Sequence, residues 1–64
     1  MKIKEMVAGD KIALSAYNAE FTAVSDAIEI QDDESPGFYR IEGFLRDEAM
    51  TLIAPGDVEY AKAQ

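Results

Sequence analysis

The sequence predicts an all-β protein of five or six short antiparallel strands, arranged as a small barrel or roll with one long, bent strand. The first observation is the alternation over residues 38–46, where Tyr39, Ile41 and Leu45 point to one side and the residues between them to the other. The second is that Gly, Pro and Asp residues separate the alternating segments, as is typical of tight turns. We therefore place residues 38–46 at the centre of a sheet, with antiparallel neighbours before and after it.

The other strands follow from the same period of two. We expect them over residues 1–7, 11–17, 20–31 and 50–54, with a short closing strand at Val58 and Tyr60 and a frayed end over 61–64. Reversals are expected at Gly9-Asp10, at Asn18-Ala19 and over residues 32–37, 46–49 and 55–57. The register that keeps one face apolar sets Leu14 opposite Ala23, Ile28 opposite Ile41, and Leu45 opposite Met50.

The segment 20–31 contains a conflict in this pattern. Phe21 and Ala23 are apolar at odd positions, whereas Ile28 and Ile30 are apolar at even positions. Since a shift of one residue turns every side chain to the other face, we infer a β-bulge or sharp bend within residues 25–27. A strand that bends midway is how small barrels turn their corners.

A helix over residues 19–30 is the alternative for this segment. Phe21, Val24 and Ile28 lie three and four residues apart, as on one face of a helix, and a helix would remove the conflict. The β-branched Thr, Val and Ile residues and the short length favour the strand.

Composition limits the chemistry of this chain. Its 64 residues contain neither Cys nor His, which excludes disulfides, thiolate or imidazole metal sites and the common nucleophile–base pairs. Ser15, Ser25 and Ser35 have no histidine to activate them, and no Gly-rich phosphate loop is present. We expect one domain over residues 1–64, no enzyme activity, no catalytic residue and no cofactor. Without a signal peptide or a membrane-spanning run, a cytoplasmic protein is expected.

The charge balance bears on the choice of partner. Thirteen acidic and six basic residues give a formal net charge of −7 at pH 7, which repels phosphate and argues against direct nucleic-acid binding. Solubility is one explanation of the acidity, and attraction to a basic protein, including mimicry of nucleic-acid phosphates, is the other. Asp32, Asp33 and Glu34 invite a Ca²⁺ interpretation, but Pro36 interrupts the spacing and a distal carboxylate is missing, so we expect no metal.

The opening Gly9-Asp10-Lys11-Ile12, the short strands joined by tight turns and the long bent strand resemble the SH3-like small β-barrels. In many of these a Gly-Asp turn leads into the first well-formed strand. The resemblance implies a fold and a tendency to act as an adaptor. It assigns no functional residue, because neither the aromatic peptide-binding ladder nor the basic nucleic-acid-binding surface is evident here.

The candidate binding site is the outward face of the central strand. Phe38, Arg40, Glu42 and Phe44 alternate there, and the expected register places Thr51 beside Phe44 and Ile53 beside Glu42. Exposed apolar groups around an arginine are typical of a binding surface. We therefore predict a non-enzymatic, acidic protein-binding module that uses this face, with Asp32, Asp33 and Glu34 steering it to a basic surface. By analogy in size and charge, a phage would use such a protein to inhibit a host nucleic-acid-handling enzyme.

Another class of function stays open at this point. Arg40 and Arg46, with Tyr17 and Asn18 at a hairpin tip, form a second candidate set. They would let an oligomer sequester a small, nucleotide-like molecule at its subunit boundaries. A homo-oligomer is also the alternative to core packing for the outward face, and the sequence leaves the oligomeric state open.

Overall fold

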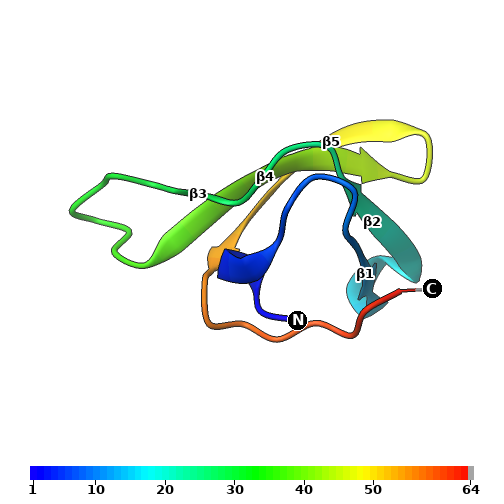
Figure 1. Ribbon diagram of the computed structural model, residues 1–64, viewed down its shortest axis with the longest axis horizontal. Coiled ribbons are helices and arrows are strands. Elements are labelled where there is room, and N and C mark those ends of the chain that lie inside the picture. The colour runs from blue at the N-terminus through cyan, green and yellow to red at the C-terminus, as the bar shows by residue number, and fades with distance from the viewer. Residues whose placement is uncertain (64) are drawn as a thin grey trace.

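The computed structural model describes residues 1–63 and consists of a single five-stranded antiparallel sheet with two short 3₁₀ helices (Figure 1). The strands are β1 (Lys11–Leu14), β2 (Ala19–Ala23), β3 (Ile28–Glu29), β4 (Phe38–Leu45) and β5 (Glu48–Pro55), and the 3₁₀ helices are η1 (Ile3–Glu5) and η2 (Ser15–Tyr17). The predicted all-β, antiparallel fold is confirmed, and the curled arrangement is consistent with a small barrel or roll. In residues 1–63 no helix is long and apolar enough to cross a membrane.

β4 is the central strand, as predicted. β2 and β3 pair with one of its edges, one after the other, and β5 pairs with the other edge along the full length of β4. Ile41 is completely buried and Gly43 is also buried, while Tyr39 and Leu45 are half-buried against the core. The inward direction of the odd positions of β4 is therefore confirmed.

β2 and β3 are the two halves of the predicted long strand, and the bend lies between them. Ala23 pairs with Gly43 and Ile28 with Arg40, so the four residues 24–27 face only two residues of β4. The start of the excursion is held by both backbone groups of Glu42: Val24 donates its N–H to the Glu42 carbonyl at 2.8 Å, and Glu42 donates its N–H to Ser25 Oγ at 3.1 Å. The bend within residues 25–27 is thus confirmed, and the helical alternative is wrong.

The change of face expected at this bend does not occur. The excursion adds two residues relative to β4, and an even number leaves Ile28 on the same side as Thr22. Ile28 consequently pairs with Arg40 instead of Ile41 and lies exposed on the outer side of the sheet. The predicted core role of Ile28 is wrong.

The registers of the two hairpins differ from the expected ones by an even number of residues, so the same side chains still point toward the core. Leu14 pairs with Ala19 and not Ala23, because η2 takes residues 15–17 out of β1 and Asn18 turns the chain in the left-handed region (φ 51°). Leu45 pairs with Glu48 and not Met50, because the turn between β4 and β5 contains two residues instead of four.

The two ends of the chain are joined to each other and to β1. The expected strand over residues 1–7 does not form: η1 takes its middle three residues, and Lys2 forms only an isolated bridge with Glu59. The last described residues do not fray as expected: Ala13 donates its N–H to Ala61 O at 2.9 Å, and Ala63 donates to Lys11 O at 3.0 Å. Residues 61–63 therefore lie along the free edge of β1. Val58 and Tyr60, expected as a closing strand, bond to the N-terminal segment instead: the Val58 carbonyl accepts the Ile3 N–H at 3.1 Å, and Tyr60 donates its N–H to the Met1 carbonyl at 2.9 Å. Gln64 is outside the described residues.

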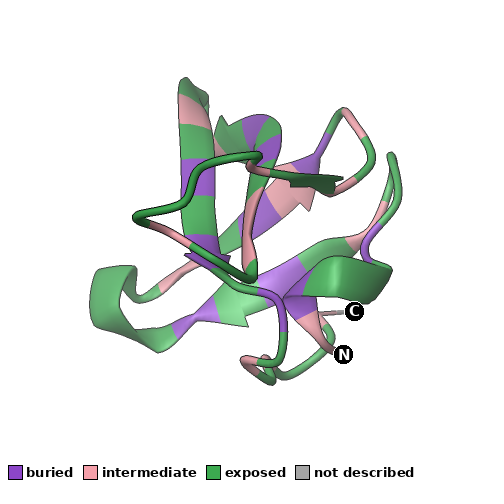
Figure 2. Cartoon of the chain, turned by 90° about the vertical axis from the view of Figure 1, so that its left-hand side faces the viewer, coloured by how far each residue is buried: buried purple, intermediate pink, exposed green. Residues whose placement is uncertain are grey.

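The core lies on the concave side of the sheet and is closed by the N-terminal segment. Figure 2 shows buried and exposed residues alternating along the strands, as a one-sided core requires. Residues from η1 and all main strands except β3 contribute; the buried set is Ile3, Met6, Ile12, Leu14, Phe21, Ala23, Ile41, Leu52 and Ala54. Because the core fills the concave side, the even-numbered residues of β4 are left on the convex side.

Candidate binding surface

The convex side of the sheet, which we call the outer face, is built from three rows of side chains across neighbouring strands. Thr22, Phe44 and Ala49 form one row, Ile28, Arg40 and Ile53 form another, and Val24 lies with Glu42 and Thr51 between them. In antiparallel sheets, directly opposed residues place their side chains on the same face at contact distance. The rows therefore make one continuous surface across β2, β3, β4 and β5.

Large apolar side chains are concentrated on the outer face. Val24 is 54% exposed, Ile28 53%, Phe44 44% and Ile53 55%. They are four of the six large hydrophobic residues that are exposed within residues 1–63; the other two are Val7 and Tyr17. Single exposed apolar residues are ordinary, but a group on one sheet face is typical of an interaction surface.

Arg40 lies at the centre of one row, with Ile28 on one side and Ile53 on the other. The side chain is exposed, and no hydrogen bond or ion pair within residues 1–63 uses its guanidinium group. An arginine flanked by apolar groups is a common centre of protein interfaces, because it combines apolar contact with several directed N–H donors. The guanidinium of Arg40 is available for such a contact.

The structure brings together most of the predicted site and changes two of the predicted neighbours. Phe38, Arg40, Glu42 and Phe44 share the outer face, although Phe38 is half-buried at the end of the sheet beside Pro55. Thr51 lies beside Glu42 instead of Phe44, and Ile53 lies beside Arg40 instead of Glu42, because the two-residue turn moves β5 by two positions relative to the expected register.

Val24 and Ile28 were missed as members of this face. The even positions Thr22, Val24 and Ile28 do carry the signal, since they continue one face of β2 if the bend adds an even number of residues. Because Ile28 is apolar, it was assigned to the core, and its place on the outer face was therefore not predicted. Between Val24 and Phe44 the outer face has a shallow hollow of about 280 Å³, which also touches Glu42 and Thr51.

The acidic loop lies beyond the Phe38 end of β4. Asp32, Asp33 and Glu34 are exposed on the connection between β3 and β4, which projects from the body of the molecule (Figure 1). The Asp32 carboxylate accepts the Glu34 N–H at 3.0 Å, and Ser35 donates its N–H to the Asp32 carbonyl at 3.1 Å, so Asp32 fixes its own turn. Asp33 and Glu34 extend the negative charge beside the outer face.

The structure separates Arg40 from the other residues of the alternative ligand-binding set. The Arg46 guanidinium donates to the Tyr17 carbonyl at 3.1 Å, and Asn18 follows directly, so these three residues meet where two turns lie side by side. Arg40 is six residues away along β4, a distance of about 20 Å in an extended strand. The two arginines do not converge within one chain.

The groups with shifted pKa values hold the two ends of the chain together. Lys4 Nζ lies 2.9 Å from Asp57 Oδ1, and this hydrogen-bonded pair raises the pKa of Lys4 and lowers the pKa of Asp57. The N-terminal amine donates to Glu59 Oε2 at 2.9 Å and lowers the pKa of that carboxyl group. Both pairs are exposed and serve the packing of η1 against the C-terminal segment.

Neither a protein-family model, nor a curated protein, nor a solved structure matches the chain. The outer face is therefore interpreted from its own chemistry.

Proposed function

We propose that the protein is a non-enzymatic, acidic binding module that docks on a basic surface of another protein through its outer face. The observation that carries this proposal is the joint exposure of Val24, Ile28, Phe44 and Ile53 around Arg40. In water about half of the surface of these side chains stays hydrated, whereas a partner that covers them removes a continuous apolar area from solvent.

The apolar part of the outer face provides affinity. A large aliphatic or aromatic side chain contributes about 1.5–3 kcal/mol when it is moved fully from water to an apolar site, so a half-exposed one has about 1 kcal/mol still to gain. Phe44 and Ile53 lie two rows apart on the face, with Glu42 in the row between them and Arg40 directly beside Ile53. Apolar anchors around an arginine match the composition of protein interface centres.

The negative net charge raises the rate of association with basic proteins and selects for them. A net charge of −7 on 64 residues attracts basic surfaces over the screening distance of about 8–10 Å at ordinary salt. The loop with Asp33 and Glu34 places part of that charge at one end of the outer face. An enzyme that handles nucleic acid presents such a basic surface, and we propose inhibition of an enzyme of this kind, as by a phage protein, as the finer form of this function.

A photo-crosslinking experiment tests the location of the site. A benzoyl-phenylalanine probe replaces Phe44 in one sample and Val7 in another, since both residues are exposed hydrophobic residues but only Phe44 lies on the outer face. The position-44 probe is expected to give a saturable crosslink to a basic protein, which is then purified. The affinity of that protein should fall at least tenfold for Phe44→Glu and should fall steeply with salt, whereas Val7→Glu should match the wild type. Equal crosslinking from the two positions would contradict the proposal.

A further inference from the structure

β5 has one edge that no other strand covers. It pairs only with β4, and no further backbone hydrogen bond within residues 1–63 involves residues 49–54. The turn between β4 and β5 has two residues, so Leu45 and Glu48, which flank it, form a pair in which the N–H of each residue bonds the C=O of the other. Every second residue of β5 after Glu48 is hydrogen-bonded to β4 in the same way. Ala49, Thr51 and Ile53 therefore turn their N–H and C=O groups away from β4, toward the free edge.

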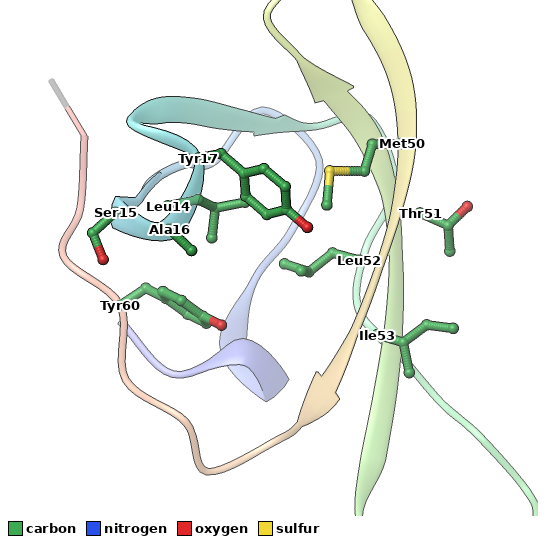
Figure 3. A pocket seen from close by; sticks show the side chains of 9 residues that line it. All are labelled: Leu14, Ser15, Ala16, Tyr17, Met50, Thr51, Leu52, Ile53 and Tyr60. Carbon is green, nitrogen blue, oxygen red and sulfur yellow. The ribbon is translucent and has the colours of Figure 1, made fainter.

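An apolar groove of about 410 Å³ runs along this edge. Its lining includes the four consecutive residues 50–53. Successive residues of a strand point to opposite faces, so one groove can contact all four only along the edge of the strand. Figure 3 shows the side chains of Met50 and Leu52 inside the groove, whereas those of Thr51 and Ile53 point to the other side of β5. What Thr51 and Ile53 present to the groove is their backbone.

The second wall of the groove comes from η2 and the C-terminal segment. Leu14, Tyr17 and Tyr60 face Met50 and Leu52 across the open space (Figure 3). Leu14 and Leu52 are buried at the floor, while Tyr17 is half-exposed at the rim. The groove thus combines a row of free peptide groups with apolar and aromatic walls, which are the two parts that recognise an added β-strand.

We propose that this groove binds an extended segment of a partner protein, which adds to the free edge of β5 as a further antiparallel or parallel strand. The segment would take up hydrogen bonds from Thr51 and Ile53 and place alternate apolar side chains between Leu52 and Tyr60. Four residues of strand extend over about 13 Å, so the groove suits a short segment. This proposal goes beyond the outer-face function, since it concerns the edge of β5 and not the side chains of its convex face.

Charge and shape define the occupant as a basic peptide segment. None of the residues that line the groove is charged, and the chain as a whole carries −7. Lysine or arginine at the solvent-facing positions of the segment is therefore attracted, whereas a second copy of this chain would bring another −7. If β5 of a second copy paired with this edge, β4 of that copy would follow on its far side. The wall formed by Tyr17 and Tyr60 occupies that space, so the sheet of a second copy could not continue there.

The test uses a short peptide of alternating lysine and valine with blocked ends, added to the ¹⁵N-labelled full chain. We expect saturable binding and at least tenfold slower hydrogen exchange at the amides of Thr51 and Ile53, with no such change at Leu52, whose amide already pairs with β4. A matched peptide with alternate backbone N-methyl groups keeps the side chains but cannot pair, and it should bind at least tenfold more weakly. This comparison needs no variant of the protein.

Two variants separate this site from the outer face. Thr51→Pro removes an N–H that points away from β4, a change that an edge strand tolerates, and it should abolish protection at Ile53. Phe44→Glu should leave peptide binding unchanged, even though it disrupts the outer face. The proposal is overturned if saturating peptide leaves both amides unprotected, or if the N-methylated peptide binds as well. It is also overturned if the peptide-free protein is a dimer in which both amides are already protected, because a second copy would then occupy the groove.

Discussion

The ring of Phe21 lies against Gly43, so closely that a Cβ atom on Gly43 would stand 2.7 Å from Phe21 Cζ. The same Cβ would overlap the carbonyl group of Thr22 on the neighbouring strand. Phe21 is completely buried and is the largest side chain in the core. Gly43 therefore lets β2 approach β4 at the point where the long strand begins to bend.

Gly43→Ala should lower the free energy of unfolding by about 3 kcal/mol or more, because the backbone of Thr22 cannot yield as a flexible side chain could. Urea denaturation followed by circular dichroism measures the change. Gly37→Ala is the comparison: Gly37 has a φ of +79° but nothing within 4 Å of a new Cβ, so only backbone strain of about 1 kcal/mol is expected. A smaller effect at Gly43 than at Gly37 would contradict the close approach.

Ser25 holds the bend in place. Its Oγ accepts the Glu42 N–H at 3.1 Å, and this bond replaces a strand-to-strand bond where the chain leaves the sheet. Ser25→Ala should cost about 1 kcal/mol of unfolding free energy. Ser15→Ala should cost less than half of that, since no hydrogen bond within residues 1–63 uses the Ser15 hydroxyl. Similar effects at the two serines would show that the bend does not depend on this bond.

Arg46 lies in the two-residue turn with a φ of 57°. A positive φ at the first turn position is typical of a type II′ turn, where glycine is strongly favoured. Arg46→Gly should therefore be more stable than Arg46→Ala by about 1 kcal/mol, because both lose the bond to the Tyr17 carbonyl but only glycine relieves the strain. Thermal unfolding of the two variants, side by side, measures the difference. Alanine as stable as glycine would show an unstrained turn.

The Lys4–Asp57 pair makes stability depend on pH. Hydrogen bonding to Lys4 lowers the pKa of Asp57 below its ordinary value of 3.8 in the folded chain. A carboxyl group with a lowered folded-state pKa stabilises the protein above its unfolded pKa, and this contribution disappears as the pH falls through the folded-state pKa. Between about pH 5 and pH 2, the wild type should therefore lose more stability than Asp57→Asn. Denaturant titrations at several pH values measure both slopes, and parallel slopes would contradict the account.

Much of the fold was predictable because a one-sided core imposes a strict alternation. The inward positions of β4 and its two antiparallel neighbours follow from that alternation. The bend within residues 25–27 was inferred from a change of face that the structure does not have, so its place was right although the reason for it was wrong. The hairpin registers were wrong by two and four residues, because tight turns decide them. The positive φ at Arg46 and the 3₁₀ helix before Asn18 could not be predicted. Glycine is the residue that usually marks a positive φ in a turn, and neither turn contains one.

The candidate site was predicted in part for the same reason. Arg40, Glu42 and Phe44 lie on the outer face as the alternation requires. Val24 and Ile28 were missed because the number of extra residues in the bend, even or odd, decides their side, and an apolar residue at a bend favours the core interpretation. The groove at the β5 edge was not predictable, since Tyr17 and Tyr60 reach it through η2 and the C-terminal segment.

The central claim is that the outer face is free for a foreign protein, and the solution mass tests it most directly. Light scattering should give the monomer mass of 7.0 kDa for the wild type and also for Phe44→Glu, with unfolding free energies within about 0.5 kcal/mol of each other. A wild type that is a dimer or larger, and that becomes a monomer in Phe44→Glu, would contradict the account, because the outer face would then be covered by a second copy of the chain.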